Sequence, residues 1–200
     1  MIGAVVLAAG LSRRMGRFKL LLPWHGRTVI ESVVRTVEAA TTGEIVVVSG
    51  YRGDDVAAAL QGTRARVVLN HDYATGEMLS SVQTGLQALG AATDAALLCL
   101  GDQPQIEADT IRRVLEAGAE DGLRRVVIPS YAMRAGHPIL LPQGIWPAVM
   151  QAAGTLNEAL DPYRADFRYV VVDAPGILAD LDTPADYEQA MVESDGEHLR

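Results

Sequence analysis

Four cationic side chains lie within seven positions near the start of the chain: Arg13, Arg14, Arg17 and Lys19. They belong to the segment LAAGLSRRMGRFK at residues 7–19, which follows a short apolar run. Small residues let a backbone approach a ligand closely, and consecutive backbone N–H groups in such a turn form an anion-binding concavity. An arginine fork and a mobile lysine charge can then neutralise a polyphosphate. The segment therefore predicts a phosphate-binding loop.

The glycine spacing of this segment differs from that of other phosphate loops. Gly10 and Gly16 are separated by five residues with no Lys-Ser or Lys-Thr pair after them, so this is not a Walker A loop, and GxGxxG is also absent. A glycine-rich turn with solvated arginines is the alternative, but small residues and four cations after a first strand favour a ligand. The residues assigned to the nucleotide here are Leu7, Ala8, Ala9, Gly10, Arg14 and Lys19, and Arg14 and Lys19 are also assigned to catalysis.

Two acidic motifs could hold a divalent cation. LGDQP, at residues 100–104, places Asp102 directly after an apolar run, with a proline that restricts the turn. DLDTPADY, at residues 180–187, places Asp182 beside a predicted helix start at Thr183 and Pro184. Mg²⁺ uses few protein carboxylates and keeps phosphate and water oxygens as its other ligands. The alternatives are an Asx-type turn at Asp102 and helix capping by Asp180 or Thr183. Beside a phosphate loop we expect Asp102 and Asp182 to bind Mg²⁺, or Mn²⁺, with Asp102 also catalytic.

Two further motifs could contact the base and the acceptor. In GEMLSSVQTGL, residues 76–86, the paired serines could cap a helix or read a base edge, since a hydroxyl both donates and accepts. The base-side candidates are Asn70, Leu79, Ser80 and Ser81, and the sequence leaves open which of Asn70, Ser80 and Ser81 touches the base. In AGHP, residues 135–138, His137 is either a solvated loop histidine or an acceptor ligand. The acceptor candidates are Gln103, Pro104, Gly136 and His137.

The composition indicates one globular α/β domain over residues 1–200, since 49% of the residues are hydrophobic. No apolar run approaches the roughly 20 residues of a membrane span, and no signal-peptide pattern opens the chain, so a cytoplasmic protein without membrane contact is expected. The formal net charge of −8 argues against a nucleic-acid partner, whereas the local basic cluster favours a small anionic ligand. The single cysteine, Cys99, cannot form an internal disulfide.

Short apolar runs alternate with segments of helical spacing, a pattern typical of a parallel, layered α/β sheet. The predicted strands cover residues 2–7, 44–49, 65–70, 95–100, 125–129 and 168–172, and the predicted helices cover 28–40, 54–60, 78–89, 106–118 and 146–153. Residues 131–142 break the alternation and predict an irregular or antiparallel insertion that could add one strand. The last dozen residues are expected to end a helix and fray. Ligands of such sheets bind beyond the carboxyl ends of the strands, a rule that selects residues 8–19, Gly50, residues 70–81 and residues 101–104.

Taken in this order, the motifs resemble those of the molybdenum cofactor nucleotidyltransferases, over nearly the whole chain. This resemblance implies a three-layer, Rossmann-like (glycosyltransferase-A-like) fold, a mostly parallel sheet with helices on both faces. The first motif alone also fits sugar- and polyol-phosphate nucleotidyltransferases. GEMLSSVQTGL, LGDQP and GHPILL are similar to the cytidylyltransferase branch, whereas the guanylyltransferase branch typically has LAGG for LAAG and lacks the paired serines. DLDTP stands where relatives often have DIDTP.

The resemblance implies transfer of CMP from CTP to the terminal phosphate of molybdenum-molybdopterin, with molybdopterin cytosine dinucleotide and pyrophosphate as products. An apo-oxidoreductase of the xanthine dehydrogenase type would be the partner that receives this cofactor. The alternatives are a GTP-dependent molybdopterin guanylyltransferase, another sugar- or polyol-phosphate nucleotidyltransferase, a glycosyltransferase that uses a nucleotide sugar, and a non-catalytic cofactor carrier or chaperone.

Overall fold

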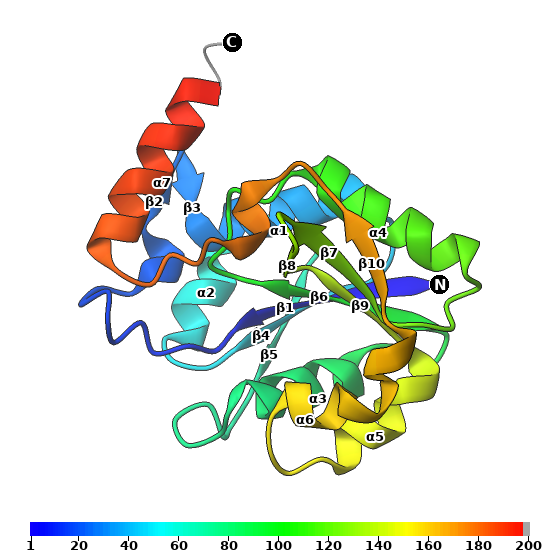
Figure 1. The fold of residues 1–200 in the computed structure, drawn as a ribbon. Coiled ribbons are helices and arrows are strands. Elements are labelled where there is room, and N and C mark those ends of the chain that lie inside the picture. The colour runs from blue at the N-terminus through cyan, green and yellow to red at the C-terminus, as the bar shows by residue number, and fades with distance from the viewer. Residues whose placement is uncertain (198–200) are drawn as a thin grey trace.

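The computed structural model describes residues 1–197, in which helices cover both faces of a mixed β-sheet (Figure 1). The sheet strands are β1 (Ile2–Ala8), β4 (Ile45–Ser49), β5 (Arg66–Leu69), β6 (Ala95–Leu100), β7 (Val127–Tyr131), β8 (Arg134–Ala135), β9 (Ile139–Pro142) and β10 (Arg168–Val171). Their order is β10-β7-β9-β6-β1-β4-β5, and β8 pairs with β7. β1 is parallel to both of its neighbours, β4 and β6, and β5 continues the parallel half.

The helices are α1 (Val29–Ala40), α2 (Gly53–Ala59), α3 (Met78–Ala88), α4 (Ala108–Glu120), α5 (Trp146–Gln151), α6 (Leu156–Leu160) and α7 (Pro184–Glu197). Apolar side chains of α1, α2 and α4 pack on one face of the sheet, and those of α3, α5 and α6 pack on the other (Figure 1). The central strands are therefore buried on both sides, which explains why they are continuous apolar runs rather than alternating ones. The predicted three-layer fold is confirmed.

The irregular segment at residues 131–142 enters the sheet itself. β9 lies between β6 and β7 and runs antiparallel to both, while the two-residue strand β8 forms a hairpin with β7. The prediction of an antiparallel addition in this segment is confirmed, but its position inside the sheet was not predicted. Leu140 and Leu141 of β9 are fully buried, one on each face, so this short strand joins the two helical layers to the sheet.

Two further elements were not expected. A small hairpin joins β2 (Pro23–Trp24) to β3 (Arg27–Thr28) ahead of α1, and its two-residue strands are too short to show a periodicity. Helix α6 begins with a reciprocal capping box between Thr155 and Glu158. The Thr-x-x-Glu spacing of this box is visible in the sequence as a helix start.

Helix α7 packs against the segment that follows LAAGLSRRMGRFK, residues 7–19, which is called the basic loop from here on. A separate apolar cluster contains Met15, Leu22, Trp24, Val29 and Leu181, with Tyr187 of α7 against it. The Tyr187 hydroxyl donates to the carbonyl of Pro23 at 2.5 Å. This cluster holds the basic loop next to the DLDTP motif. Of the expected frayed end, residues 198–200 lie outside the described part of the chain.

No helix within residues 1–197 combines the length and apolar character needed to cross a membrane.

Candidate functional site

A cavity of about 340 Å³ opens at the carboxyl ends of the parallel strands. Three parts of the chain line its wall. The end of β1 and the basic loop supply Leu7, Ala8, Ala9, Gly10, Arg14, Lys19 and Leu20. The segment after β5 supplies Tyr73, Gly76, Glu77, Met78 and Ser81, and the acidic motifs supply Leu100, Asp102, Asp180 and Asp182. The segments that the sequence placed after strands thus meet around one space, as expected for an open parallel sheet.

The basic loop is closed on itself by backbone geometry. Ser12 has a φ of 52° and Gly16 a φ of 66°, a left-handed backbone that glycine adopts without steric cost. The Ser12 hydroxyl accepts the backbone N–H of Lys19 at 3.2 Å, which ties the two ends of the loop together. A Cβ added at Gly10 would meet no protein atom within 4 Å, so the glycine leaves room beside the backbone for a ligand.

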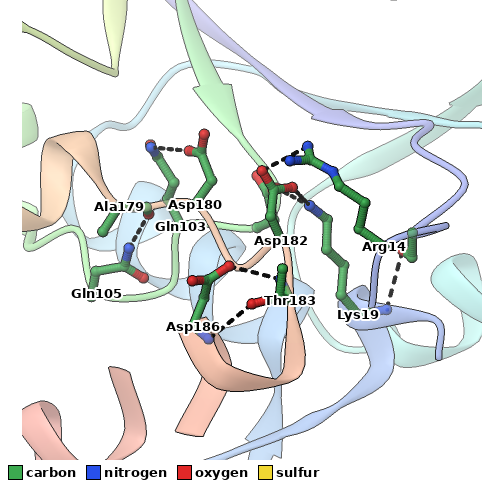
Figure 2. A network of polar contacts seen from close by, with 11 residues as sticks. Arg14, Lys19, Gln103, Gln105, Ala179, Asp180, Asp182, Thr183 and Asp186 are labelled. Atoms are coloured by element: carbon green, nitrogen blue, oxygen red, sulfur yellow. Dashed lines mark hydrogen bonds and ion pairs between the residues drawn. The ribbon is translucent and has the colours of Figure 1, made fainter. Parts of the chain in front are cut away.

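Lys19 lies between the two aspartates predicted to bind metal, and Figure 2 shows it directed at one of them, Asp182. Its Nζ donates to Asp102 Oδ2 and, at 3.0 Å, to Asp182 Oδ1. Arg14 reaches the other oxygen of Asp182 at 2.8 Å. Burial alone would lower the pKa of Lys19, but the carboxylates of Asp102 and Asp182 outweigh it and raise the pKa above its usual value. The carboxylates of Asp102 and Asp182 therefore both face the ammonium group of Lys19.

Both aspartates contact a single ammonium group, so their oxygens can face one cation together. Among the described residues, no group of three or more histidine, cysteine or acidic side chains could hold a metal. Two carboxylates agree with the donor set of Mg²⁺, which takes its remaining ligands from phosphate and water oxygens. A metal held here would replace the ammonium of Lys19 between the carboxylates.

Asp180 is a site residue that the sequence reasoning treated only as a possible helix cap. Its carboxylate lines the cavity and accepts the amide Nε2 of Gln103 at 2.7 Å (Figure 2). Burial raises the pKa of Asp180, and the nearby carboxylates of Asp102 and Asp182 raise it further. Its position two residues before Asp182 was the available signal. The cap itself is formed by Thr183, whose hydroxyl accepts the backbone N–H of Asp186 at 3.3 Å.

The predicted base-side residues form a connected group at the start of α3. Asn70 is buried, with 2% of its surface exposed, and its amide donates to Ser80 and Ser81. Leu79 is buried in the apolar layer beneath α3. Of these four described residues only Ser81 lines the cavity. The glycine of this segment, Gly76, has no space for a Cβ because the hydroxyl of Ser80 and the carbonyl of Asp72 occupy it.

Tyr73 and Met78 also face the cavity, although neither was singled out from the sequence. Tyr73 packs against Gly50 at the end of β4, where an added Cβ would lie 2.5 Å from the Tyr73 Cβ. A glycine directly after a buried strand was the signal for this close approach.

The four acceptor candidates lie beside the cavity rather than in its wall. Gln103 and Pro104 are buried, and the Gln103 amide is directed at Asp180. Gly136 packs against the backbone of Ile177, and the backbone N–H of His137 donates to the carbonyl of Ile177 at 3.3 Å. Burial lowers the pKa of His137 to about 4, an effect that Asp102 partly opposes. His137 is therefore neutral at pH 7, and the assignment of these four residues to the acceptor stays a prediction.

Comparison with known proteins identifies the family of this chain. A family described as the MobA-like NTP transferase domain matches residues 4–167. The chain belongs to this family. It is 29% identical over 187 residues to the Escherichia coli molybdenum cofactor cytidylyltransferase, with 93% of each chain covered. It is also 33% identical over 153 residues to the nicotine blue oxidoreductase of Paenarthrobacter nicotinovorans, covering 74% of each.

Solved structures show the same fold. A nucleotidyl transferase from Methanothermobacter superposes with a TM-score of 0.82 at 30% identity, covering 96% of this chain and 97% of that one. The Mycobacterium tuberculosis protein Rv0371c superposes with a TM-score of 0.81 at 28% identity, covering 96% and 98%. This MobA-like chain is thus similar to these two structures along nearly its full length.

Proposed function

We propose that this MobA-like protein transfers CMP from CTP to the terminal phosphate of molybdenum-molybdopterin, with release of pyrophosphate. The observation that carries the proposal is the charged cluster in the cavity, where Arg14 and Lys19 of a phosphate-type loop face Asp102 and Asp182. The similarity to a molybdenum cofactor cytidylyltransferase over 93% of the chain supports this choice of substrates.

The loop would bind the triphosphate. The backbone beside Gly10 is open to the cavity, and Arg14 and Lys19 supply positive charge where the β- and γ-phosphates would lie. A phosphate acceptor is already ionised at neutral pH, so its attack on the α-phosphorus needs no strong base. Orientation of the two phosphates and neutralisation of the departing pyrophosphate then account for most of the catalysis.

Asp102 and Asp182 would hold Mg²⁺, and Mn²⁺ could replace it. The ion would supply charge neutralisation and orientation of the triphosphate oxygens. A structure of Rv0371c was solved as a complex with manganese, which supports the proposal that this chain binds a divalent cation. With an ion held by these carboxylates, the Nζ of Lys19 would be available to bind a phosphate oxygen of the nucleotide.

The acceptor would approach from the side of Gln103, Pro104, Gly136 and His137, next to Asp102. Its product, molybdopterin cytosine dinucleotide, would pass to an apo-oxidoreductase of the xanthine dehydrogenase type. The neutral imidazole of His137 at pH 7 suits contact with an uncharged part of the acceptor rather than with its phosphate.

Thermal unfolding with Mg²⁺ and each triphosphate tests the nucleotide half of the proposal. A ligand at one hundred times its Kd adds about 2.7 kcal/mol of stability, which for a chain of this size raises the Tm by roughly 5–10 °C. We expect such a rise with CTP and smaller rises with GTP, ATP and UTP. A rise confined to GTP would instead assign the chain to guanylyl transfer.

Pyrophosphate release with molybdenum-molybdopterin tests the transfer itself. We expect one pyrophosphate per cytosine dinucleotide formed. One relative is named an oxidoreductase, so binding of a nucleotide does not by itself establish transfer. If CTP binds but no pyrophosphate appears in the presence of the acceptor, the transferase proposal is wrong.

A further inference from the structure

The motif DLDTPAD, residues 180–186, carries a third acidic side chain after Asp180 and Asp182. This third one, Asp186, is exposed and lines a surface groove along α7, whereas the cavity wall contains Asp180 and Asp182. The described residues include no group of three histidine, cysteine or acidic side chains that could hold a metal, so Asp186 does not complete the proposed site at Asp102 and Asp182. Its role has to follow from its contacts within the protein.

Asp186 and Thr183 form a reciprocal capping box at the start of α7 (Figure 2). The Asp186 carboxylate accepts the backbone N–H of Thr183 at 2.7 Å, and the Thr183 hydroxyl accepts the backbone N–H of Asp186 at 3.3 Å. These bonds satisfy two donors that a helix start leaves without a partner in the helix. The backbone at Thr183 is therefore held in place directly after Asp182.

The capping box acts on the backbone on one side of Asp182, and other hydrogen bonds act on the other side. The N–H of Thr183 belongs to the peptide group that joins it to Asp182, while the N–H of Asp182 itself donates to the carbonyl of Asp180 at 3.0 Å. One residue earlier, the N–H of Leu181 donates to the carbonyl of Asp102 at 3.3 Å, and Leu181 is 1% exposed. Because a peptide group is planar, fixing both groups that flank Asp182 fixes the direction of its Cα–Cβ bond.

We propose that Asp186 is a positioning residue, which holds Asp182 in the direction where its carboxylate and that of Asp102 face one cation together. The inference rests on the metal site of the proposed function. In the structure the Lys19 ammonium lies at that position, 3.0 Å from Asp182. Without the capping box the peptide group after Asp182 could rotate, and only a fraction of the molecules would present both carboxylates to an ion. The apparent affinity for the ion falls in proportion to that fraction.

The chain contains a second capping box that serves as a matched control. At the start of α6, Glu158 accepts the backbone N–H of Thr155 at 2.7 Å, and the Thr155 hydroxyl accepts that of Glu158 at 3.2 Å. Neither residue is part of the described cavity wall. Glu158→Ala therefore removes the same kind of cap as Asp186→Ala, and each should lower the Tm by about 2–4 °C. An effect of Asp186→Ala beyond this common loss of stability reports on Asp182.

The experiment measures the Kd of the full chain for Mn²⁺ from the paramagnetic resonance signal of the free ion, which needs no substrate. Asp186→Ala should raise this Kd by about five- to tenfold, the value of one net hydrogen bond. Asp186→Asn loses the charge but keeps an oxygen that accepts the Thr183 N–H, so its Kd should stay within about twofold of the wild-type value. Glu158→Ala should bind Mn²⁺ as the wild type does.

Pyrophosphate release gives a second measurement. Asp186→Ala should need a correspondingly higher concentration of Mg²⁺ for the half-maximal rate, while its kcat at saturating Mg²⁺ stays close to that of the wild type. A role in stability alone would change neither the Mg²⁺ requirement nor the Kd for Mn²⁺, as Glu158→Ala should show.

The inference and the proposed function fail separately. An equal Kd for Mn²⁺ in Asp186→Ala and the wild type, or a wild type that binds no Mn²⁺, would overturn the inference. If Asp186→Asn binds Mn²⁺ as weakly as Asp186→Ala, the side chain acts through its charge and the inference is also wrong. If the Mn²⁺ pattern is as expected but no pyrophosphate appears, the proposed function fails and the inference stands. Should Asp186→Ala not fold, Thr183→Val removes the other half of the box and should raise the Kd in the same direction.

Discussion

The two ends of the cavity, proposed above to bind the phosphates and the base and named accordingly here, hold their side chains in place by different interactions. At the phosphate end, Lys19, Asp102 and Asp182 form ion pairs whose partners can be exchanged for ligand ions. At the base end, Asn70 is buried and neutral, and its donors and acceptor are all bound within the protein. Charge acts over several ångströms and tolerates rearrangement, whereas a buried neutral hydrogen bond depends on direction. The phosphate end is thus suited to affinity and rate, and the base end to choice of substrate.

The largest effect is expected from Asp102→Ala at the phosphate end. Without this carboxylate only Asp182 remains to hold the cation, so turnover should fall by about 10³-fold. The fold should survive, because Asp102 is partly exposed and its ion pair lies at the cavity wall. Pyrophosphate release measures the rate, and thermal unfolding without ligand checks the fold. Near-normal turnover in a folded variant would remove Asp102 from the metal site.

Lys19→Met should lower kcat/KM by about 10²-fold, since a charge that neutralises the triphosphate is lost. The same substitution should increase the rise in Tm that Mg²⁺ alone causes. Without the ammonium, Asp102 and Asp182 repel each other, and Mg²⁺ has no competitor between them. Mg²⁺ alone should therefore raise the Tm of this variant more than that of the wild type.

The matched control for this prediction is Arg17→Met, which removes a cation of the same loop that is not part of the cavity wall. It should leave both the kinetics and the response to Mg²⁺ close to those of the wild type. Equal Mg²⁺ responses in Lys19→Met and the wild type would show that the two aspartates do not share one cation.

At the base end, Gly76→Ala should disturb the hydrogen-bond network without touching the ion pairs. An added Cβ would meet the Ser80 hydroxyl and lie 2.8 Å from the carbonyl of Asp72, so the segment that carries the serines must shift. We expect CTP affinity to fall by about tenfold, with inorganic triphosphate bound as before. Gly144→Ala is the control, because a Cβ at that position meets no atom within 4 Å. Equal loss of both ligands would contradict the separation of the two ends.

The same contrast explains what could be predicted from the sequence. The basic loop and LGDQP were recognisable because charged residues directly after apolar strands must gather at one edge of a parallel sheet. DLDTP follows no strand directly and was recognisable from its aspartates beside a helix start. The roles within the base end were not, because the donors of Asn70 are used up by side chains ten and eleven residues away. Gln103 shows the same limit. Its type suggested contact with the acceptor, but its amide reaches Asp180, a partner distant in sequence.

The position of β9 in the sheet could not be predicted from the sequence for a related reason. Residues 139–142 form an apolar run too short to reveal which strands it would pair with, and antiparallel insertion between β6 and β7 depends on the rest of the sheet. Local pattern thus predicted the strands and the loop, while tertiary partners decided the insertion and the direction of hydrogen bonds.

The last prediction concerns stability rather than turnover or affinity, and it tests the acceptor side, where His137 is neutral at pH 7 as the side chains around Asn70 are. Burial lowers the pKa of His137 to about 4, whereas an unfolded histidine titrates near 6.5. Between these values the unfolded chain binds more protons than the folded one, so stability falls as the pH drops from about 7 to 4. After allowance for partial exposure, the loss from this residue is about 2 kcal/mol. His137→Gln should flatten that part of the curve in denaturant unfolding, whereas His71→Gln, at an exposed position, should not. If both variants keep the wild-type slope, His137 is not held neutral by burial, and the acceptor side is closer in character to the phosphate end.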